Sequence, residues 1–315
     1  ECISRKTKAR LPKISLVALV MNGSVVLTWI EAIRPKTLVA SIAPVMIGVS
    51  LAISDGFFNL YPSLATLIAA VLIQIGTNLA NDYYDFVRGA DNEGRIGPRR
   101  VSQAGLISPI KVKQAMILSL GTAFLFGIYL VAVGGWVIAL IGLVSILCAV
   151  GYTAGPFALA YNGLGDVFVF AFFGPIAVAG TYWVQTNALS HDAILAGIGI
   201  GALTTMILVV NNMRDVNTDK LAGKNTLVVR MGLRASRLEY VALLIIGLVA
   251  PIIGVVEFDW PRSSLASCVV LLLAISPTNL VVRSSDPRVL MSALPSTAIM
   301  VGIYAILLSF GLLVD

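Results

Sequence analysis

Long apolar stretches, separated by shorter polar segments, form the main pattern of the sequence. A helix that crosses the hydrocarbon core of a bilayer needs roughly 17–25 predominantly apolar residues. Glycine and proline within such a stretch do not argue against a helix, because membrane-spanning helices tolerate both. The pattern predicts nine spans, at residues 37–54, 61–81, 113–133, 136–153, 164–184, 192–212, 238–256, 264–283 and 294–313. The expected fold class is therefore an all-α, polytopic membrane protein with about nine transmembrane helices.

The composition supports a membrane protein and excludes several other classes. The chain has 315 residues, of which 58% are hydrophobic and only 12% are charged, and its mean hydropathy is +0.92. A soluble domain usually carries about 25% charged residues. A soluble enzyme, a nucleic-acid-binding protein, a disordered protein and a disulfide scaffold are therefore excluded. The net charge of +6 indicates basic loops at a membrane surface, and we expect the lipid bilayer rather than nucleic acid as a partner.

The basic residues are distributed unevenly between the two sides of the predicted spans. Every Lys and Arg except Arg262 lies before the first span or in the loops on that same side. Cytoplasmic loops of membrane proteins carry an excess of Lys and Arg. The pattern thus predicts a cytoplasmic N-terminus and, with an odd number of spans, a C-terminus on the opposite side.

The N-terminal segment differs from the rest of the chain. Five basic residues between Arg5 and Lys13 precede a short apolar stretch, and no small-residue cleavage site follows. We interpret residues 1–23 as a basic tail that need not be native, and residues 24–315 as a single transmembrane domain. The only histidine is His191 and no CxxC pair occurs, so the sequence offers no Cys/His zinc site.

Two acidic segments end the second and sixth predicted spans, on the same side of the membrane. The first runs from Asn78 to Asp91 and the second from Asn211 to Asp219. On a helix, positions three or four residues apart share a face, so the amide and carboxylate side chains within each segment line up. The candidate metal ligands are Asn78, Asn81, Asp82, Asp85, Asp91, Asn212, Asp215 and Asp219.

The chemistry of these two segments favours magnesium and a phosphate-bearing ligand. An ionised aspartate at the centre of a membrane helix costs about 2.5–3.5 kcal/mol, so two such clusters call for a reason. Oxygen ligands suit Mg²⁺, which takes one or two carboxylates together with substrate phosphates. Basic side chains among the acidic ones could bind the phosphate oxygens: Arg88, Arg214, Lys220 and Lys224. The alternative, two ordinary solvated helix ends, is less favoured because both related clusters lie on one face.

Other polar residues each have two interpretations. Arg34 and Lys36 open the first span, where they either anchor it at the interface or contact a phosphate or carboxylate. Arg99 and Arg100 follow turn residues, and act either as orientation charges or as part of a lid. Asp166 lies in a polar patch that lacks Lys and Arg, and either caps the fifth span or faces the site.

Several segments together carry a resemblance to a known family. The segments are RPKTL at 34–38, NLANDYYD at 78–85, GAD at 89–91, RIGPRR at 95–100, YNGLGD at 161–166 and NNMRDVNTDKLAGKNTLVVRMG at 211–232. With them the chain resembles the UbiA-type intramembrane prenyltransferases from about residue 24 to its C-terminus. Asp82 and Asp85 are three residues apart and Asp91 follows across Gly89. That spacing is typical of the branch that prenylates 1,4-dihydroxy-2-naphthoate.

The resemblance implies a fold, a reaction and a set of site residues. The fold is a horseshoe of nine helices around a cavity open to the lipid. The reaction is Mg²⁺-dependent transfer of a polyprenyl group from polyprenyl diphosphate to 1,4-dihydroxy-2-naphthoate, with loss of diphosphate and CO₂, giving demethylmenaquinone. The implied catalytic residues are Asp82, Asp85, Asp215 and Asp219. The expected substrate-binding residues are Arg34, Lys36, Arg88, Arg99, Arg100, Arg214, Lys220 and Lys224.

Two alternatives remain open at this point. One is a sibling enzyme of the same family that uses a phytyl donor or another aromatic acceptor. The other is a cation-coupled membrane transporter, although transporters usually place their ion sites near the bilayer midplane and these acidic clusters lie at one face. We expect the protein in the cell membrane, with its active face toward the cytoplasm.

Overall fold

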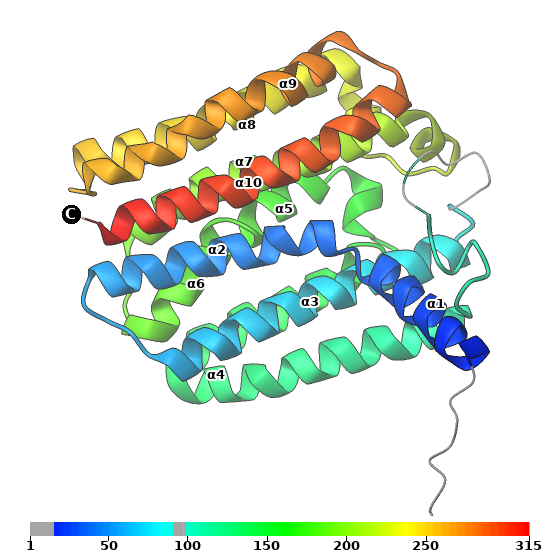
Figure 1. Ribbon diagram of the computed structural model, residues 1–315, viewed down its shortest axis with the longest axis horizontal. Coiled ribbons are helices and arrows are strands. Elements are labelled where there is room, and N and C mark those ends of the chain that lie inside the picture. The colour runs from blue at the N-terminus through cyan, green and yellow to red at the C-terminus, as the bar shows by residue number, and fades with distance from the viewer. Residues whose placement is uncertain (1–15, 91–96, 98, 315) are drawn as a thin grey trace, which may run out of the picture.

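A computed structural model describes residues 16–90, 97 and 99–314 of the chain, and this part contains helices and no strands. The long helices run roughly side by side, as Figure 1 shows. Their bounds are α1 (Leu16–Ile33), α2 (Pro35–Ser54), α3 (Leu60–Val87), α4 (Pro109–Gly151), the 3₁₀ turn η1 (Leu159–Asn162), α5 (Gly165–Phe172), α6 (Pro175–Thr186), α7 (His191–Leu221), α8 (Leu227–Glu257), the 3₁₀ segment η2 (Arg262–Val269), α9 (Val270–Arg283) and α10 (Pro287–Leu313).

The nine expected spans are present, two of them as arms of one continuous segment. In the described part of the chain, eight helical segments are long and apolar enough to cross a membrane, and α4 is one of them. A straight helix of its length would extend about 65 Å. However, Val112 and Ala149, near its two ends, belong to the same buried cluster. The segment therefore folds back at Gly135, whose φ of 70° ends the first arm.

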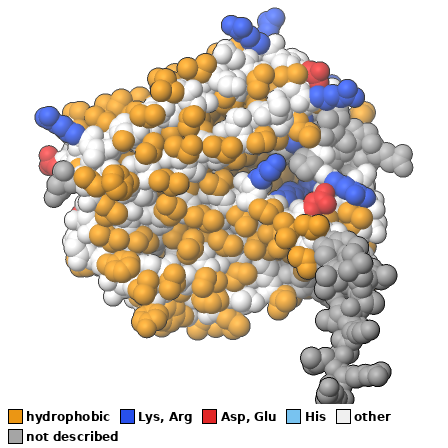
Figure 2. All heavy atoms as spheres, viewed as in Figure 1, with side chains coloured by type: hydrophobic (Ala, Val, Ile, Leu, Met, Phe, Trp, Pro, Cys, Tyr) orange, Lys and Arg blue, Asp and Glu red, His pale blue; other side chains and the backbone are white. Residues whose placement is uncertain are grey.

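The outer surface agrees with a membrane environment. Figure 2 shows apolar side chains along the length of the helices and most Lys and Arg side chains gathered near one end of the molecule. The chain is thus a multi-pass membrane protein.

The helices differ from the predicted spans mainly at this basic end. Helices α3 and α7 continue well past the ends of the second and sixth spans, so both acidic segments are helical extensions of the spans. Helix α1 was not expected, and its residues 16–23 fall in the segment interpreted as a tail. Trp29 and Ala32 of α1 pack near Leu79 at the end of α3.

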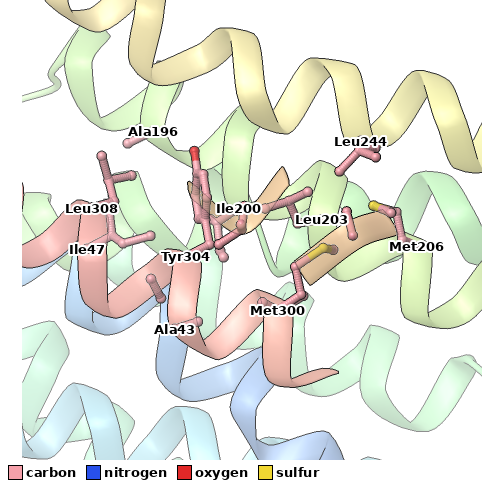
Figure 3. Close-up of a cluster of buried hydrophobic side chains, with 14 of the residues drawn as sticks. Ala43, Ile47, Ala196, Ile200, Leu203, Met206, Leu244, Met300, Tyr304 and Leu308 are labelled. Carbon is pink, nitrogen blue, oxygen red and sulfur yellow. The ribbon is translucent and has the colours of Figure 1, made fainter. Parts of the chain in front are cut away.

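The largest buried cluster lies between α2, α7, α8 and α10. In Figure 3 the side chains of Ile47, Ile200 and Tyr304 meet there from three different helices. The Tyr304 hydroxyl donates a hydrogen bond to the backbone oxygen of Gly247 at 3.0 Å, which satisfies this buried polar group. This cluster holds α7 firmly on the side that faces away from the cavity.

The fifth predicted span is broken into α5 and α6 at Gly174. A Cβ atom at Gly174 would lie 2.5 Å from the backbone oxygen of Gly197, and one at Gly197 would lie 2.5 Å from Cα of Pro175. Small residues thus let the break approach the backbone of α7, as is common between membrane helices. The close contact places the C-terminus of α5 and the N-terminus of α6 beside α7.

We predict that Gly197→Val destabilises the protein. Overpacking a tight contact typically costs about 1–3 kcal/mol, so we expect a lower Tm in detergent, measured by thermal unfolding. Gly121→Val is the matched control, because a Cβ there meets no atom within 4 Å. An unchanged Tm for the Gly197 variant would contradict the close approach of the two backbones.

Candidate active site

A large cavity lies between α2, α3, α4, α5, α6 and α7, with a volume of about 1000 Å³. Along α3 its wall extends from Thr66 to Asp85, which corresponds to about 28 Å of helix. Most of the wall is apolar, and includes Phe124, Ile138 and Phe172. Polar side chains gather where α3 and α7 carry the acidic segments. The cavity can therefore hold a long apolar chain with a polar head at one end.

The structure brings the two acidic segments together at that polar end. A smaller cavity of about 40 Å³ is lined by Asp85 of α3 and by Asp215 and Asp219 of α7. Its remaining wall is formed by Ala90, Arg100, Asn211, Asn212, Thr218 and Lys224. Residues separated by more than a hundred positions in the sequence thus share one pocket.

Asp85 is held by partners from two loops. Its carboxylate accepts a hydrogen bond from the Tyr161 hydroxyl at 2.9 Å and lies 3.3 Å from Arg100. Both Asp85 and Arg100 are buried. Burial, followed by the negative charge of Asp85, raises the pKa of the Tyr161 hydroxyl above its usual value. Tyr161 therefore stays protonated and remains a donor to Asp85.

Asp215 lies beside a buried guanidinium on its own helix. Nε of Arg214 donates to one carboxylate oxygen at 2.8 Å, and the terminal nitrogen donates to the other at 2.5 Å. The two-pronged geometry suits a planar guanidinium and a carboxylate. Arg214 is only 2% exposed, so its charge is directed at this site and not at bulk water.

Asp82 has a different environment from the one its spacing predicted. Its carboxylate oxygens accept hydrogen bonds from the backbone N–H groups of Val101 and Ser102, both at 3.0 Å. It lines neither of the two cavities. The carboxylate thus fastens the loop after α3 and, with it, places Arg100 against Asp85.

The two asparagines of the first segment line the larger cavity and fasten neighbouring elements. The Asn78 side chain donates to the backbone oxygen of Ile33 at 2.8 Å and to the Thr37 hydroxyl at 2.9 Å. These bonds hold the α1–α2 junction, where Arg34 adopts a left-handed backbone with φ of 56°. Asn81 accepts a hydrogen bond from Thr153 at 3.1 Å.

The expected substrate-binding residues fall into two groups. Those that line the cavities are Arg34, Lys36, Arg100, Arg214 and Lys224. The others, Arg88, Arg99 and Lys220, are exposed and line neither cavity. Arg88 donates to the backbone oxygen of Gly155 and lies 4.6 Å from the centre of the Tyr161 ring. Asp91, the remaining candidate ligand, lies outside the described residues.

Some residues of the site had no assigned role in the sequence. Tyr161 and Tyr152 lie between the fourth and fifth spans, in the polar patch without basic residues. That composition was the available signal, but it did not show which carboxylates the tyrosines face. Asn211 also lines both cavities, one position before the expected ligand Asn212. Asp166 lines the larger cavity, which answers the open question about its direction.

The oxygen donors at the polar end fit magnesium bound together with a phosphate ligand. Among the described residues, no three His, Cys, Asp or Glu side chains form a group that could hold an ion. Mg²⁺ is usually bound by one or two carboxylates together with waters and substrate phosphates, so it does not need such a group. The small cavity offers the carboxylates of Asp85, Asp215 and Asp219, of which one or two would suffice, and the amide oxygens of Asn211 and Asn212.

Comparisons with known proteins point to one family. The profile of the UbiA prenyltransferase family matches residues 41–303. The chain is 42% identical over 225 residues to the 1,4-dihydroxy-2-naphthoate octaprenyltransferase of Escherichia coli (strain K12), which covers 70% of this chain and 73% of that protein. It is 34% identical over 293 residues to the protein of the same name from Bacillus subtilis (strain 168), covering 90% and 91%.

The fold is also shared with a solved structure. A UbiA homolog from Archaeoglobus fulgidus, bound to GPP and Mg²⁺, superposes with a TM-score of 0.53 at 15% identity, covering 90% of this chain and 99% of that one. At this identity the likeness concerns the fold alone. It confirms the expected class of all-α membrane protein.

We predict that Asp82→Ala releases the loop after α3. Hydrogen bonds to charged groups contribute about 1.5–3 kcal/mol each, so amide hydrogen exchange at residues 99–107 should accelerate roughly tenfold or more. Mass spectrometry of peptides from this loop measures the change. Asp286→Ala, an exposed substitution at the start of α10, serves as the control. Unchanged exchange in the loop would contradict the anchoring role of Asp82.

Proposed function

This chain belongs to the UbiA prenyltransferase family, and we propose that it transfers a polyprenyl group from polyprenyl diphosphate to 1,4-dihydroxy-2-naphthoate. The observation that carries the proposal is a large, mostly apolar cavity that shares Asp85, Asn211 and Asn212 with the small cavity where both acidic segments meet. Such a cavity matches a lipid with a diphosphate head. The acceptor is supported by the two naphthoate prenyltransferases to which the chain is similar over most of its length.

We propose that Asp85, Asp215 and Asp219 hold magnesium with help from Asn211 and Asn212, which line the same small cavity. Bound Mg²⁺ would supply charge neutralisation for the diphosphate as it leaves. Arg100 and Lys224 line the same pocket and add fixed positive charge. Arg34 and Lys36 lie at the N-terminal end of α2 and line the large cavity, where they can contact the diphosphate or the carboxylate of the acceptor.

The apolar wall has two tasks in the proposed reaction. It binds the polyprenyl chain, and it excludes water from the allylic carbon that becomes electron-deficient as diphosphate departs. The ring carbon that bears the carboxylate attacks this carbon, and loss of CO₂ restores the aromatic ring. The product of this redox-neutral step is the quinol, demethylmenaquinol, and its two-electron oxidation to demethylmenaquinone is a separate reaction. The cavity brings the two reactants into contact, which accounts for much of the expected acceleration.

Asp82 acts in this scheme as a positioning residue. Its carboxylate is engaged by Val101 and Ser102, so it holds Arg100 near Asp85 without contacting the substrate. We therefore place Asp82 outside the proposed set of metal ligands. The polar end coincides with the basic end of the molecule, which the positive-inside rule assigns to the cytoplasm. We accordingly propose that the cavity receives its substrates from the cytoplasmic face of the cell membrane, with the wall open to lipid.

We predict turnover by the purified protein in detergent. With Mg²⁺, a polyprenyl diphosphate and 1,4-dihydroxy-2-naphthoate, it should release diphosphate and CO₂ in equal amounts and form a prenylated naphthoquinol, measured by mass spectrometry. Removal of Mg²⁺ by EDTA should stop the reaction.

Panels of acceptors and donors make this test decisive. Turnover only with another aromatic acceptor, or only with a phytyl donor, would support the sibling enzyme. No turnover with any acceptor would contradict an enzyme, and cation flux into protein-containing vesicles would then support a transporter.

We predict different kinetic effects for the aspartates of the first segment. Asp85→Asn should lower kcat on the order of 100-fold or more, because it removes charge from the reacting end. The Mg²⁺ concentration needed for half-maximal activity should rise as well. Asp82→Asn should lower kcat less, on the order of tenfold, because one backbone hydrogen bond is weakened. Its Mg²⁺ requirement should match that of the wild type, and a shift as large as that of Asp85→Asn would restore Asp82 as a ligand.

A further inference from the structure

Asp166 is a buried acid that the proposed metal site does not use. It lies in the first turn of α5 and is 5% exposed. Among the described residues, neither of its carboxylate oxygens has a hydrogen-bond partner. Its side chain lines the large cavity. Buried polar groups in proteins are nearly always hydrogen-bonded, so an unpartnered carboxylate facing a cavity indicates a ligand that supplies the donor.

The position of Asp166 is close to the reacting end of the cavity. A Cβ at the preceding residue, Gly165, would lie 2.9 Å from the hydroxyl of Tyr152 and 3.5 Å from Leu208. Tyr152 and Asp166 line the same large cavity, and Asp85 lines it at the polar end.

Helix α7 relates the level of Asp166 to that of the proposed metal ligands. Leu208, which packs near Gly165, is seven positions before Asp215, a rise of about 10 Å along the helix. Thr204, Leu208 and Asn211 all line the large cavity from this helix. The Thr204 hydroxyl is also buried and has no hydrogen-bond partner in the part of the chain that the structure describes. The cavity wall next to Asp166 thus combines apolar surface with a few polar atoms that lack a hydrogen-bond partner among the described residues. This part of the wall lies next to the polar end, on the side toward the apolar interior of the cavity.

A hydroxylated aromatic ring fits this wall. An ionised carboxylate can only accept hydrogen bonds, so its complement is an O–H or N–H donor. The polyprenyl chain has no such donor, and the diphosphate is repelled by a negative charge. A ring hydroxyl provides the donor, and the rest of the ring suits the apolar surface around Phe168 and Leu208.

We propose that Asp166 accepts a hydrogen bond from a ring hydroxyl of the aromatic acceptor and thereby sets the ring beside the allylic carbon. This inference rests on the proposed function, and it names the residue that recognises the acceptor. The hydrogen bond draws the hydroxyl proton toward Asp166 and raises the electron density of the ring. No proton needs to leave the hydroxyl for this effect.

The test measures acceptor binding in the absence of the prenyl diphosphate. Fluorescence titration gives the Kd of 1,4-dihydroxy-2-naphthoate and of 2-naphthoate, which lacks both hydroxyls, for the wild type and for Asp166→Ala. Loss of a charge-assisted hydrogen bond should weaken binding of the dihydroxy compound roughly tenfold or more. The Kd of 2-naphthoate should not change. Asp166→Asn, which keeps an acceptor oxygen, should recover part of the lost affinity.

Controls separate this role from a structural one. Asp286→Asn, which changes an exposed acid that does not line the cavity, should bind both compounds like the wild type. The KM for polyprenyl diphosphate and the Mg²⁺ requirement of Asp166→Ala should equal those of the wild type. Tm measurements show whether the variant is folded, and Asp166→Asn provides the comparison if Asp166→Ala is not.

Three results would overturn the inference. Equal weakening of both naphthoates would indicate a general change of the cavity, and unchanged binding of the dihydroxy compound would show that Asp166 does not contact it. A shifted Mg²⁺ requirement would make Asp166 a metal ligand. The proposed function fails separately, through absence of turnover in the wild type. Wild-type turnover with unaltered acceptor binding in the variants contradicts this inference alone.

Discussion

The structure depends on burying carboxylates at the ends of membrane helices. Asp82, Asp85 and Asp215 are each at most 8% exposed, and an unpaired charge in such a place is costly. Each of the three is matched differently. Asp82 accepts from backbone N–H groups, Asp85 faces Arg100 and Tyr161, and Asp215 faces Arg214. Two segments far apart in the sequence must close over α3 to provide the partners of Asp82 and Asp85, whereas α7 itself provides the partner of Asp215, so the charges organise the polar end of the cavity.

The apolar part of the cavity depends on packing on the other side of α7. The cluster around Ile200 and Tyr304 fixes α7 against α2, α8 and α10, while Gly174 and Gly197 let the break between α5 and α6 lie against the same helix. One face of α7 therefore packs in the core, and another face lines the cavity. A helix fixed in this way can present Asp215 and Thr204 at constant depths, which a reaction between two bound substrates requires.

Hydropathy predicted the spans because a bilayer demands long apolar helices, and the nine segments follow from that constraint. It could not predict that α3 and α7 continue into the acidic segments, because charged residues end an apolar run without ending a helix. The sequence also suggested that Asp82 and Asp85 share a face. Their separation depends on where the loop through Val101 returns, and this is a tertiary contact. The direction of Asp166 was undecided for the same reason, since a carboxylate in the first turn of a helix is equally suited to capping it.

Burial alone does not separate the acids of this molecule into roles, but their partners do. A carboxylate whose oxygens both accept from backbone N–H groups and that lines neither cavity, as in Asp82, is placed to hold a loop. The Asp85 carboxylate is paired with Arg100 and Tyr161. It can exchange Arg100 for a metal cation, and the guanidinium of Arg100 can then bind a phosphate. A carboxylate with no partner, as in Asp166, is incomplete until a donor enters the cavity. The partners of the three acids thus support the proposed roles of Asp82 as an anchor, Asp85 as a metal ligand and Asp166 as a substrate contact.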